Sequence, residues 1–199
     1  MKQLIDTELD AIHFCAEVLA NGGVVALPTE TVYGLVTKWD SAAGRERIYQ
    51  LKHRPASKRL QMLAPSLDAA LAAGVADSAA LRKLAARFWP GALTVVVPNA
   101  DRTDTIGLRI PDHPFVLRLL RKCNFVFAAT SANLSGTPAA INILDAVNGL
   151  DGEPDVAVDG GVITVTGGKA STVVSLLDDT PAIIREGSIK LGQIAAALG

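Results

Sequence analysis

The sequence predicts an α/β protein whose sheet mixes parallel and antiparallel strands. Short apolar segments such as 24–27 indicate buried strands, and the stretches between them carry apolar residues at helical spacing. Strands and helices alternate irregularly, and some successive strands lack the crossover helix that a doubly wound parallel sheet requires. A chain of 199 residues is most simply one domain, 1–199, large enough to bury a core.

The first half of the chain is predicted to contain four helices, each preceded by a residue that can cap it. These helices begin after Thr7, Ser41, Ser66 and Ser78. The first ends at the turn 21–23, and the second runs to about Lys52. The strands expected here are 24–27, 60–63 and 93–97, the last of them after the turn 89–91.

The second half alternates short strands with fewer helices. The expected strands are 106–110, 125–129, 156–158, 172–176 and 182–184. Pro114 is well placed as the first residue of a helix, and a C-terminal helix is expected from Ser188.

The composition is that of an ordinary globular protein, with 49% hydrophobic and 20% charged residues. Two cysteines, Cys15 and Cys123, cannot form a disulfide framework, and no Cys/His spacing suggests a metal site. The acids near the N-terminus do not suit a signal peptide, and no apolar run approaches the ~20 residues that span a bilayer. We therefore expect a cytoplasmic protein that does not interact with membranes.

Positive charge is concentrated between Arg45 and Arg59. This fifteen-residue segment holds six of the 19 lysines and arginines, in a chain with 20 acids. They are Arg45, Arg47, Lys52, Arg54, Lys58 and Arg59. Like charges at this density repel one another unless an anion offsets them, so the segment indicates an anion-binding site. A basic helix end that complements the helix dipole is the structural alternative.

Polar segments directly follow or interrupt four apolar strands, where α/β proteins place ligand sites. They are 28–34, 52–55, Arg109 within 106–110, and 130–133. Lys52 and Arg54 leave a helix before Pro55 and can point at one polyanion. An arginine inside an apolar strand is rarely buried without a carboxylate or phosphate partner.

Each polar segment also has a structural explanation when taken alone. The segment 28–34 is compatible with a capped turn, Arg109 with a structural ion pair, and Ser131 and Asn133 with a helix cap. Four such segments in one small domain favour a binding site. GxGxxG and GxSxG motifs are absent from the sequence, and its three histidines are scattered, so no nucleophile–base pair is predicted.

Six segments of the chain resemble the YrdC family, the threonylcarbamoyl-AMP synthases. They are Pro28-Thr-Glu-Thr-Val-Tyr-Gly-Leu35, Lys52-His-Arg-Pro55, Arg109-Ile-Pro-Asp-His-Pro114, Thr130-Ser-Ala-Asn-Leu-Ser-Gly136, Ser171-Thr-Val173 and Arg185-Glu-Gly187. The resemblance covers almost the whole chain, and the joint order of the segments is highly specific. It implies a twisted mixed parallel and antiparallel sheet with flanking helices around a large positively charged cavity.

The resemblance also implies a reaction. L-threonine, bicarbonate and ATP would give threonylcarbamoyl-AMP and pyrophosphate, the first step in forming N6-threonylcarbamoyladenosine next to the tRNA anticodon. The product would pass to a separate tRNA threonylcarbamoyl transferase complex. Because this reaction brings two anions together, it needs positioning and charge neutralisation more than an activated nucleophile.

Individual residues take roles from the same resemblance. The catalytic set would be Lys52, Arg54, Ser131 and Asn133. ATP would be bound by Arg54, Lys58, Thr105, Asn133 and Arg185. Threonine would be bound by Thr31, Arg109, Ser131 and Ser171. Mg²⁺ would arrive with ATP and be held by its phosphates and water, with no protein metal site and no organic cofactor.

The chain departs from the family at Leu63, where many members have a histidine, so no threonine contact is assigned there. Two other functions stay compatible with the sequence. One is a double-stranded RNA-binding or ribosome-associated factor that uses the same basic cavity, and tRNA or double-stranded RNA is a possible partner of the chain. The other is a paralogue that adenylates another carbamate. An aromatic content of only 5% argues against an RNA site built on base stacking.

Overall fold

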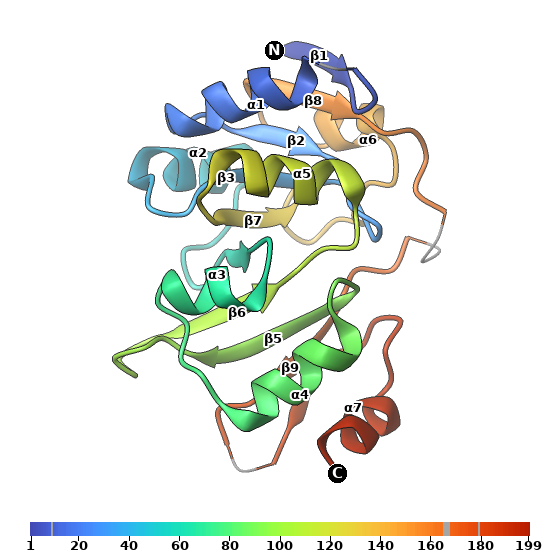
Figure 1. Ribbon diagram of the computed structural model, residues 1–199. Helices are drawn as coiled ribbons and strands as arrows, with labels where there is room; N and C mark the ends of the chain where they lie inside the picture. The colour runs from blue at the N-terminus through green and yellow to red at the C-terminus, as the bar shows by residue number, and fades with distance from the viewer. Residues whose placement is uncertain (9, 165–167, 179) are drawn as a thin grey trace.

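The computed structural model describes residues 1–8, 10–164, 168–178 and 180–199. Its described strands form one ten-stranded sheet in the order β1-β8-β2-β3-β7-β4-β6-β5-β9-β10 (Figure 1). The strands are β1 (Lys2–Ile5), β2 (Val25–Leu27), β3 (Gly34–Lys38), β4 (Gln61–Leu63), β5 (Leu93–Pro98), β6 (Thr105–Arg109), β7 (Phe127–Ser131), β8 (Val156–Asp159), β9 (Thr172–Ser175) and β10 (Ala182–Arg185). The helices are α1 (Ala11–Ala20), α2 (Ala42–Lys52), α3 (Leu67–Ala72), α4 (Ala79–Phe88), α5 (Pro114–Cys123), α6 (Ile143–Asn148) and α7 (Leu191–Leu198).

The sheet is mixed, as the sequence predicts. Strands β1 and β8, β8 and β2, β4 and β6, and β5 and β9 pair in parallel. The remaining neighbours pair antiparallel. The α/β class with an irregular sheet is therefore confirmed.

Three serines cap helices as expected. The side chains of Ser41, Ser66 and Ser78 each accept a hydrogen bond from the third following backbone N–H, and Pro114 is the first residue of α5. The capping box at Thr7 is wrong, because α1 begins only at Ala11 and its cap position makes no side-chain hydrogen bond. The chain before that helix pairs with β8 as strand β1 and then turns, which moves the helix start beyond Thr7.

The sequence did not reveal β1, β3 or α6. Strand β3 begins at the last residue of the polar segment 28–34, and its conformation is set by pairing with β2 and β7 on its two sides. Strand β7 begins and ends two residues later than expected. Thr130 and Ser131 are therefore inside this strand, where the expectation had placed them after it.

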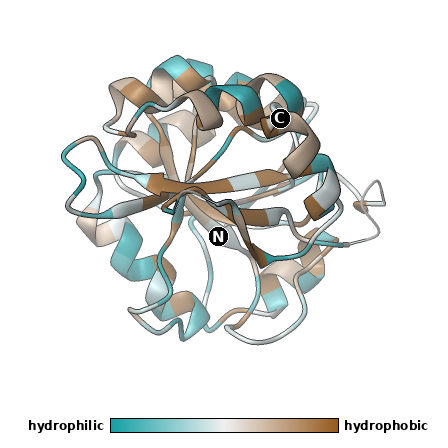
Figure 2. Cartoon of the chain, turned by 90° about the horizontal axis from the view of Figure 1, so that it is seen from below, coloured by the Kyte–Doolittle hydropathy of each residue, from teal (hydrophilic) through white to brown (hydrophobic). Residues whose placement is uncertain are grey.

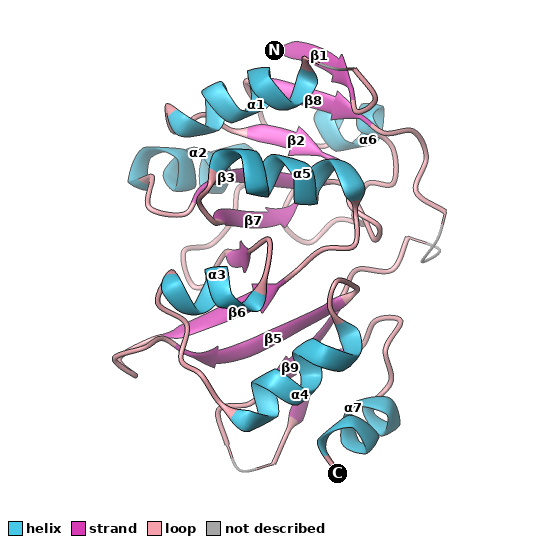
Figure 3. Ribbon diagram, viewed as in Figure 1, coloured by secondary structure: helices cyan, strands magenta, loops and turns pink. Residues whose placement is uncertain are grey.

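Helices cover both faces of the half of the sheet that β1, β8, β2, β3 and β7 form. Helices α1 and α5 lie side by side over one face and contribute to one apolar core, whereas α2 and α6 contribute to a second core on the other face (Figure 3). Helices α3, α4 and α7 pack with β4, β5 and β6 in a third core. Figure 2 shows apolar residues concentrated in the central strands, with hydrophilic residues in the surrounding helices and loops. Among the described residues, no helix is long and apolar enough to cross a membrane.

Candidate functional site

A cavity of about 600 Å³ lies over the half of the sheet that β4, β6, β5, β9 and β10 form. Side chains alternate between the two faces of a strand, and here one face packs into the third core while the other lines the cavity. The strand residues that line it are Gln61 of β4, Thr94 and Val96 of β5, Thr105, Gly107 and Arg109 of β6, Val173 of β9, and Ile184 and Arg185 of β10. The loop 54–60, the end of β7, Val32 and the two residues before β9, Ala170 and Ser171, complete the wall.

The cavity is lined by five cations that come from three separate parts of the chain. They are Arg54, Lys58, Arg59, Arg109 and Arg185. None of the described lining residues is acidic. Arg185 is affected by this concentration of charge: burial, followed by repulsion from Arg109 and Arg54, lowers the pKa of its guanidinium. The arrangement suits a ligand with several negative charges.

Seven of the site residues predicted from the sequence lie together in this lining. They are Arg54, Lys58, Thr105, Arg109, Ser131, Ser171 and Arg185. Three others lie outside the lining but contact its members or their loop: Lys52, Thr31 and Asn133.

Lys52 is a buried cation behind the end of β7. Its ammonium donates to the backbone carbonyls of Ser131 and Asn133, and its side chain is 1% exposed. Burial, followed by repulsion from Arg54 and Lys58, lowers its pKa from 10.5 to about 7. Lys52 therefore joins α2 to the strand end that presents Ser131, in place of the direct cavity position expected for it.

Arg54 organises the loop that follows α2. Its Nε donates to the carbonyl of Lys58 at 2.8 Å, and its Nη2 donates to the carbonyl of Arg59 at 2.8 Å. Burial lowers the pKa of this guanidinium. The loop is thus folded around one cation while it presents Lys58 to the same cavity.

Arg109 forms the ion pair that the sequence offered as one explanation for it, and it also lines the cavity. Its Nη2 lies 2.7 Å from Oε1 of Glu30 in an ion pair, and it also donates to Oγ1 of Thr31 at 2.9 Å. Its Nε donates to the carbonyl of Gly91 at 3.2 Å. The guanidinium is therefore held on several sides while the residue still lines the cavity. Sequence reasoning missed Glu30, although it lies in the polar segment 28–34.

Asn133 shapes the loop after β7. Its Nδ2 donates to the carbonyls of Leu134 at 2.7 Å and Thr137 at 2.9 Å, and its Oδ1 is buried without a partner among the described residues. The next helix, α6, begins at Ile143, so Ser131 and Asn133 are not a helix cap. The capping explanation for this segment is wrong.

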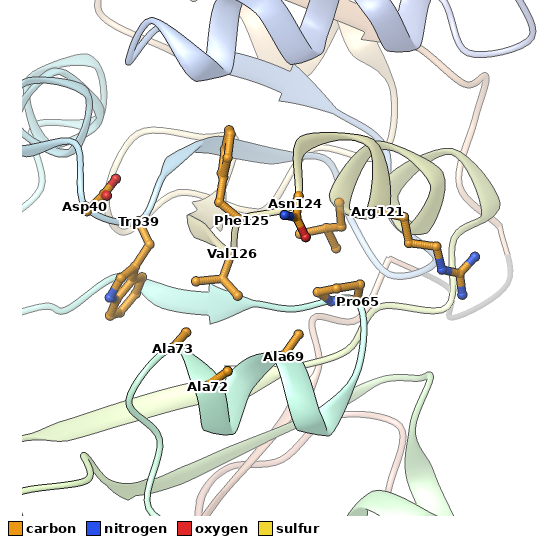
Figure 4. Close-up of a pocket in the computed structure, with 11 residues that line it drawn as sticks. Trp39, Asp40, Pro65, Ala69, Ala72, Ala73, Arg121, Asn124, Phe125 and Val126 are labelled. Carbon is orange, nitrogen blue, oxygen red and sulfur yellow. The ribbon is translucent and has the colours of Figure 1, made fainter.

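A second cavity, of about 610 Å³, lies between α3 and α5 (Figure 4). Small and apolar side chains such as Pro65, Ala69 and Val126 dominate its lining, which holds one arginine, Arg121, and one acid, Asp40. It contains none of the residues that the sequence singled out. Three cations of the segment 45–59, together with Arg109 and Arg185, line the cavity over β4, β6, β5, β9 and β10 instead.

Comparison with known proteins shows which family the chain belongs to. The model of the Sua5/YciO/YrdC family, described as "Telomere recombination", matches residues 17–187. The threonylcarbamoyl-AMP synthase of Bacillus subtilis is 38% identical over 98% of this chain and 58% of its own length. A putative threonylcarbamoyl-AMP synthase of Mycobacterium leprae is 33% identical over 98% of this chain and 90% of its own length.

Solved structures agree with these relatives. The crystal structure of Pyrococcus abyssi Sua5 complexed with L-threonine matches with a TM-score of 0.90 and 31% identity, covering 100% of this chain and 60% of that one. The chain thus spans about three fifths of the length of the Bacillus and Pyrococcus proteins. The segment matched by the family model, the sequence identities and the shared fold together show that this chain belongs to the Sua5/YciO/YrdC family.

Proposed function

We propose that the chain is an L-threonylcarbamoyladenylate synthase, a nucleotidyltransferase that forms threonylcarbamoyl-AMP and pyrophosphate from L-threonine, bicarbonate and ATP. The observation that carries this proposal is the convergence of five cations and several hydroxyl groups on one cavity of about 600 Å³ in a member of this family. The threonylcarbamoyl-AMP synthases among its relatives and the L-threonine complex of P. abyssi Sua5 support the choice of substrates.

The chemistry fits a site that neutralises charge. The amine of threonine and bicarbonate combine to a carbamate with loss of water, and a carbamate oxygen then attacks the α-phosphorus of ATP and expels pyrophosphate. Both partners in the second step are anions, so bringing them together requires cations and precise placement. A covalent protein intermediate is not needed.

The position of each residue in the cavity suggests which part of the substrates it binds. Arg109, fixed by Glu30 and Thr31, is suited to the carboxylate of threonine. Arg54, Lys58 and Arg185 are suited to the phosphates, and Thr105 to the nucleotide. Ser131 and Ser171 offer hydroxyls between these groups, and Lys52 and Asn133 fix the loop that presents Ser131.

Magnesium enters this proposal as part of the substrate. Among the described residues, no group of three His, Cys, Asp or Glu side chains is arranged to hold a metal, and the cavity wall offers hydroxyls but no carboxylate. This donor set fits an ion carried by the ATP phosphates and water, which neutralises phosphate charge. The product would pass to a separate tRNA threonylcarbamoyl transferase complex in the cytoplasm.

The test is an assay of pyrophosphate release and of threonylcarbamoyl-AMP by mass spectrometry. We expect release only when ATP, L-threonine and bicarbonate are all present, because the attacking group is the adduct of the last two. Equal release from ATP alone would exclude the proposed reaction.

A further inference from the structure

A row of hydrogen bonds crosses the cavity floor from β10 to β4. The Nη2 of Arg185 donates to Oγ of Ser171 at 3.3 Å, and it also donates to the carbonyl of Ser171 at 2.9 Å. Oγ of Ser171 lies 2.9 Å from Oγ1 of Thr94, and Oγ1 of Thr94 donates to Oε1 of Gln61 at 3.0 Å. Ser171 and Thr94 are 2% and 3% exposed, so bulk water does not satisfy their hydroxyls.

With the Gln61 amide oriented as it is in the structure, the protons in this row point in one direction. The hydroxyl of Thr94 has a single proton, which is used on Gln61. Ser171 must therefore be the donor in its bond to Thr94, and it can accept from Arg185 because a hydroxyl has two lone pairs. A permanent cation at one end thus fixes the carbonyl oxygen of the Gln61 amide at the other.

The fixed carbonyl also fixes the other half of the amide. Thr94 holds Oε1, so Nε2 of Gln61 is held in a fixed direction too. This amide nitrogen carries two protons, and no described residue accepts a hydrogen bond from it. Gln61 pairs with Ala129 of β7 and lines the cavity beside Arg109 and Ser131. It also lines a small recess between those two residues.

We propose that Gln61 is a further substrate-binding residue, whose Nε2 donates to an anionic oxygen of the bound substrates. The inference rests on the proposed function for the identity of those substrates. The oxygen belongs either to the carboxylate or carbamate derived from threonine or to a phosphate of ATP. Both are anionic acceptors, and hydrogen bonds to charged groups are the stronger kind.

The sharpest variant is Gln61→Glu. It keeps the shape and the oxygen that accepts from Thr94, but it replaces the donor with a second, negatively charged acceptor. Gln61→Met removes the donor without adding charge. Gln3→Glu is the matched control, because it makes the same chemical change at an exposed position on β1, at the opposite edge of the sheet from β10.

Binding of ATP and of L-threonine is measured separately by isothermal titration calorimetry, with thermal unfolding on the same preparations. We expect Gln61→Glu to weaken one ligand or both by roughly 10- to 100-fold, the scale of losing a hydrogen bond to a charged group. Gln61→Met should weaken the same ligand less, and Gln3→Glu should change neither. The ligand that is weakened identifies the source of the anionic oxygen.

A purely structural role for Gln61 predicts a different pattern. Gln61→Glu would then bind both ligands normally, while Gln61→Met would have a lower melting temperature, and that result would overturn the inference. Failure of the proposed function is separable. If the wild-type protein binds ATP and threonine but releases no pyrophosphate, the proposed function is wrong. The role of Gln61 is still tested in that case, because its test measures only the affinity for each ligand.

Discussion

Lys52 is the most deeply buried cation of the candidate site, and its position makes stability depend on pH. Its pKa is about 7 in the folded protein and 10.5 ordinarily. Below pH 7 the folded and unfolded chains both carry its proton, and burying the charge costs stability. Between pH 7 and 10.5 the unfolded chain keeps a proton that the folded chain has released, so stability rises with pH in this window.

We predict that this rise disappears in Lys52→Met. The free energy of unfolding of the wild type minus that of the variant should increase from pH 7 to pH 9, and it should be flat between pH 5 and pH 6. Denaturant unfolding at each pH measures both values. The difference between the two proteins isolates Lys52 from Cys15, whose pKa burial raises to about 12. Parallel curves for the two proteins would show that Lys52 stays charged throughout.

At the scale of elements, the side chain of Thr172 in β9 makes three hydrogen bonds to the segment after β10. Oγ1 of Thr172 accepts from the backbone N–H groups of Gly187 at 3.0 Å and Ile189 at 3.1 Å, and it donates to the carbonyl of Ile189 at 2.8 Å. A Cβ at Gly187 would lie 2.4 Å from the carbonyl oxygen of Ala170 and 2.5 Å from the backbone nitrogen of Thr172. The glycine in Arg185-Glu-Gly187 is therefore required by the close approach of two backbones.

We predict that Gly187→Ala displaces this segment and with it Arg185. Stability should fall by about 1–3 kcal/mol, the usual cost of overpacking, and the KM for ATP should rise because Arg185 leaves its place in the cavity. Gly192→Ala is the control, because a Cβ there meets nothing within 4 Å and lies inside helix α7. It should be neutral or stabilising by up to about 1 kcal/mol. Equal melting temperatures for the two variants would contradict the close-approach argument.

The elements that could be predicted from the sequence are those that local chemistry specifies. A serine cap acts within three residues, so Ser41, Ser66 and Ser78 mark their helices without knowledge of the fold. Strand β1 was missed because most of its residues are exposed and it depends on β8, more than 150 residues away, for its pairing. Strand β3 was hidden by its polar neighbours, since only the pairing with β2 and β7 defines it.

At the scale of the whole molecule, the same distinction governs the candidate site. The cation cluster and Arg109 were recognisable because charge inside or beside an apolar strand demands a partner. Glu30 could not be matched to Arg109, because the pair is formed by chain segments almost eighty residues apart. Thr94 and Gln61 look like ordinary strand residues until β4, β6, β5 and β9 lie side by side, which turns isolated hydroxyl and amide groups into one row.

The molecule as a whole is almost neutral, with 19 basic and 20 acidic residues, yet five of its cations line one cavity. Burial, followed by repulsion from Arg109 and Arg54, lowers the pKa of Arg185, and such repulsion destabilises the protein when no anion is bound. We therefore predict that ATP or inorganic pyrophosphate raises the melting temperature. At a concentration of 100 Kd the gain is about 2.7 kcal/mol. For a chain of this size that corresponds to an increase of about 5–10 °C.

Differential scanning calorimetry with ATP, pyrophosphate and AMP tests this prediction, because AMP lacks the β- and γ-phosphates. At equal concentrations AMP should stabilise least, and 0.5 M salt should reduce all three shifts by screening the charges. Arg185→Gln should lose much of the ATP shift while its own melting temperature holds or rises, since the variant relieves repulsion in the unliganded cavity. The opposite result would be a lower melting temperature in Arg185→Gln with an ATP-induced shift as large as that of the wild type. Arg185 would then stabilise the fold through its hydrogen bonds with Ser171 and would not bind the nucleotide.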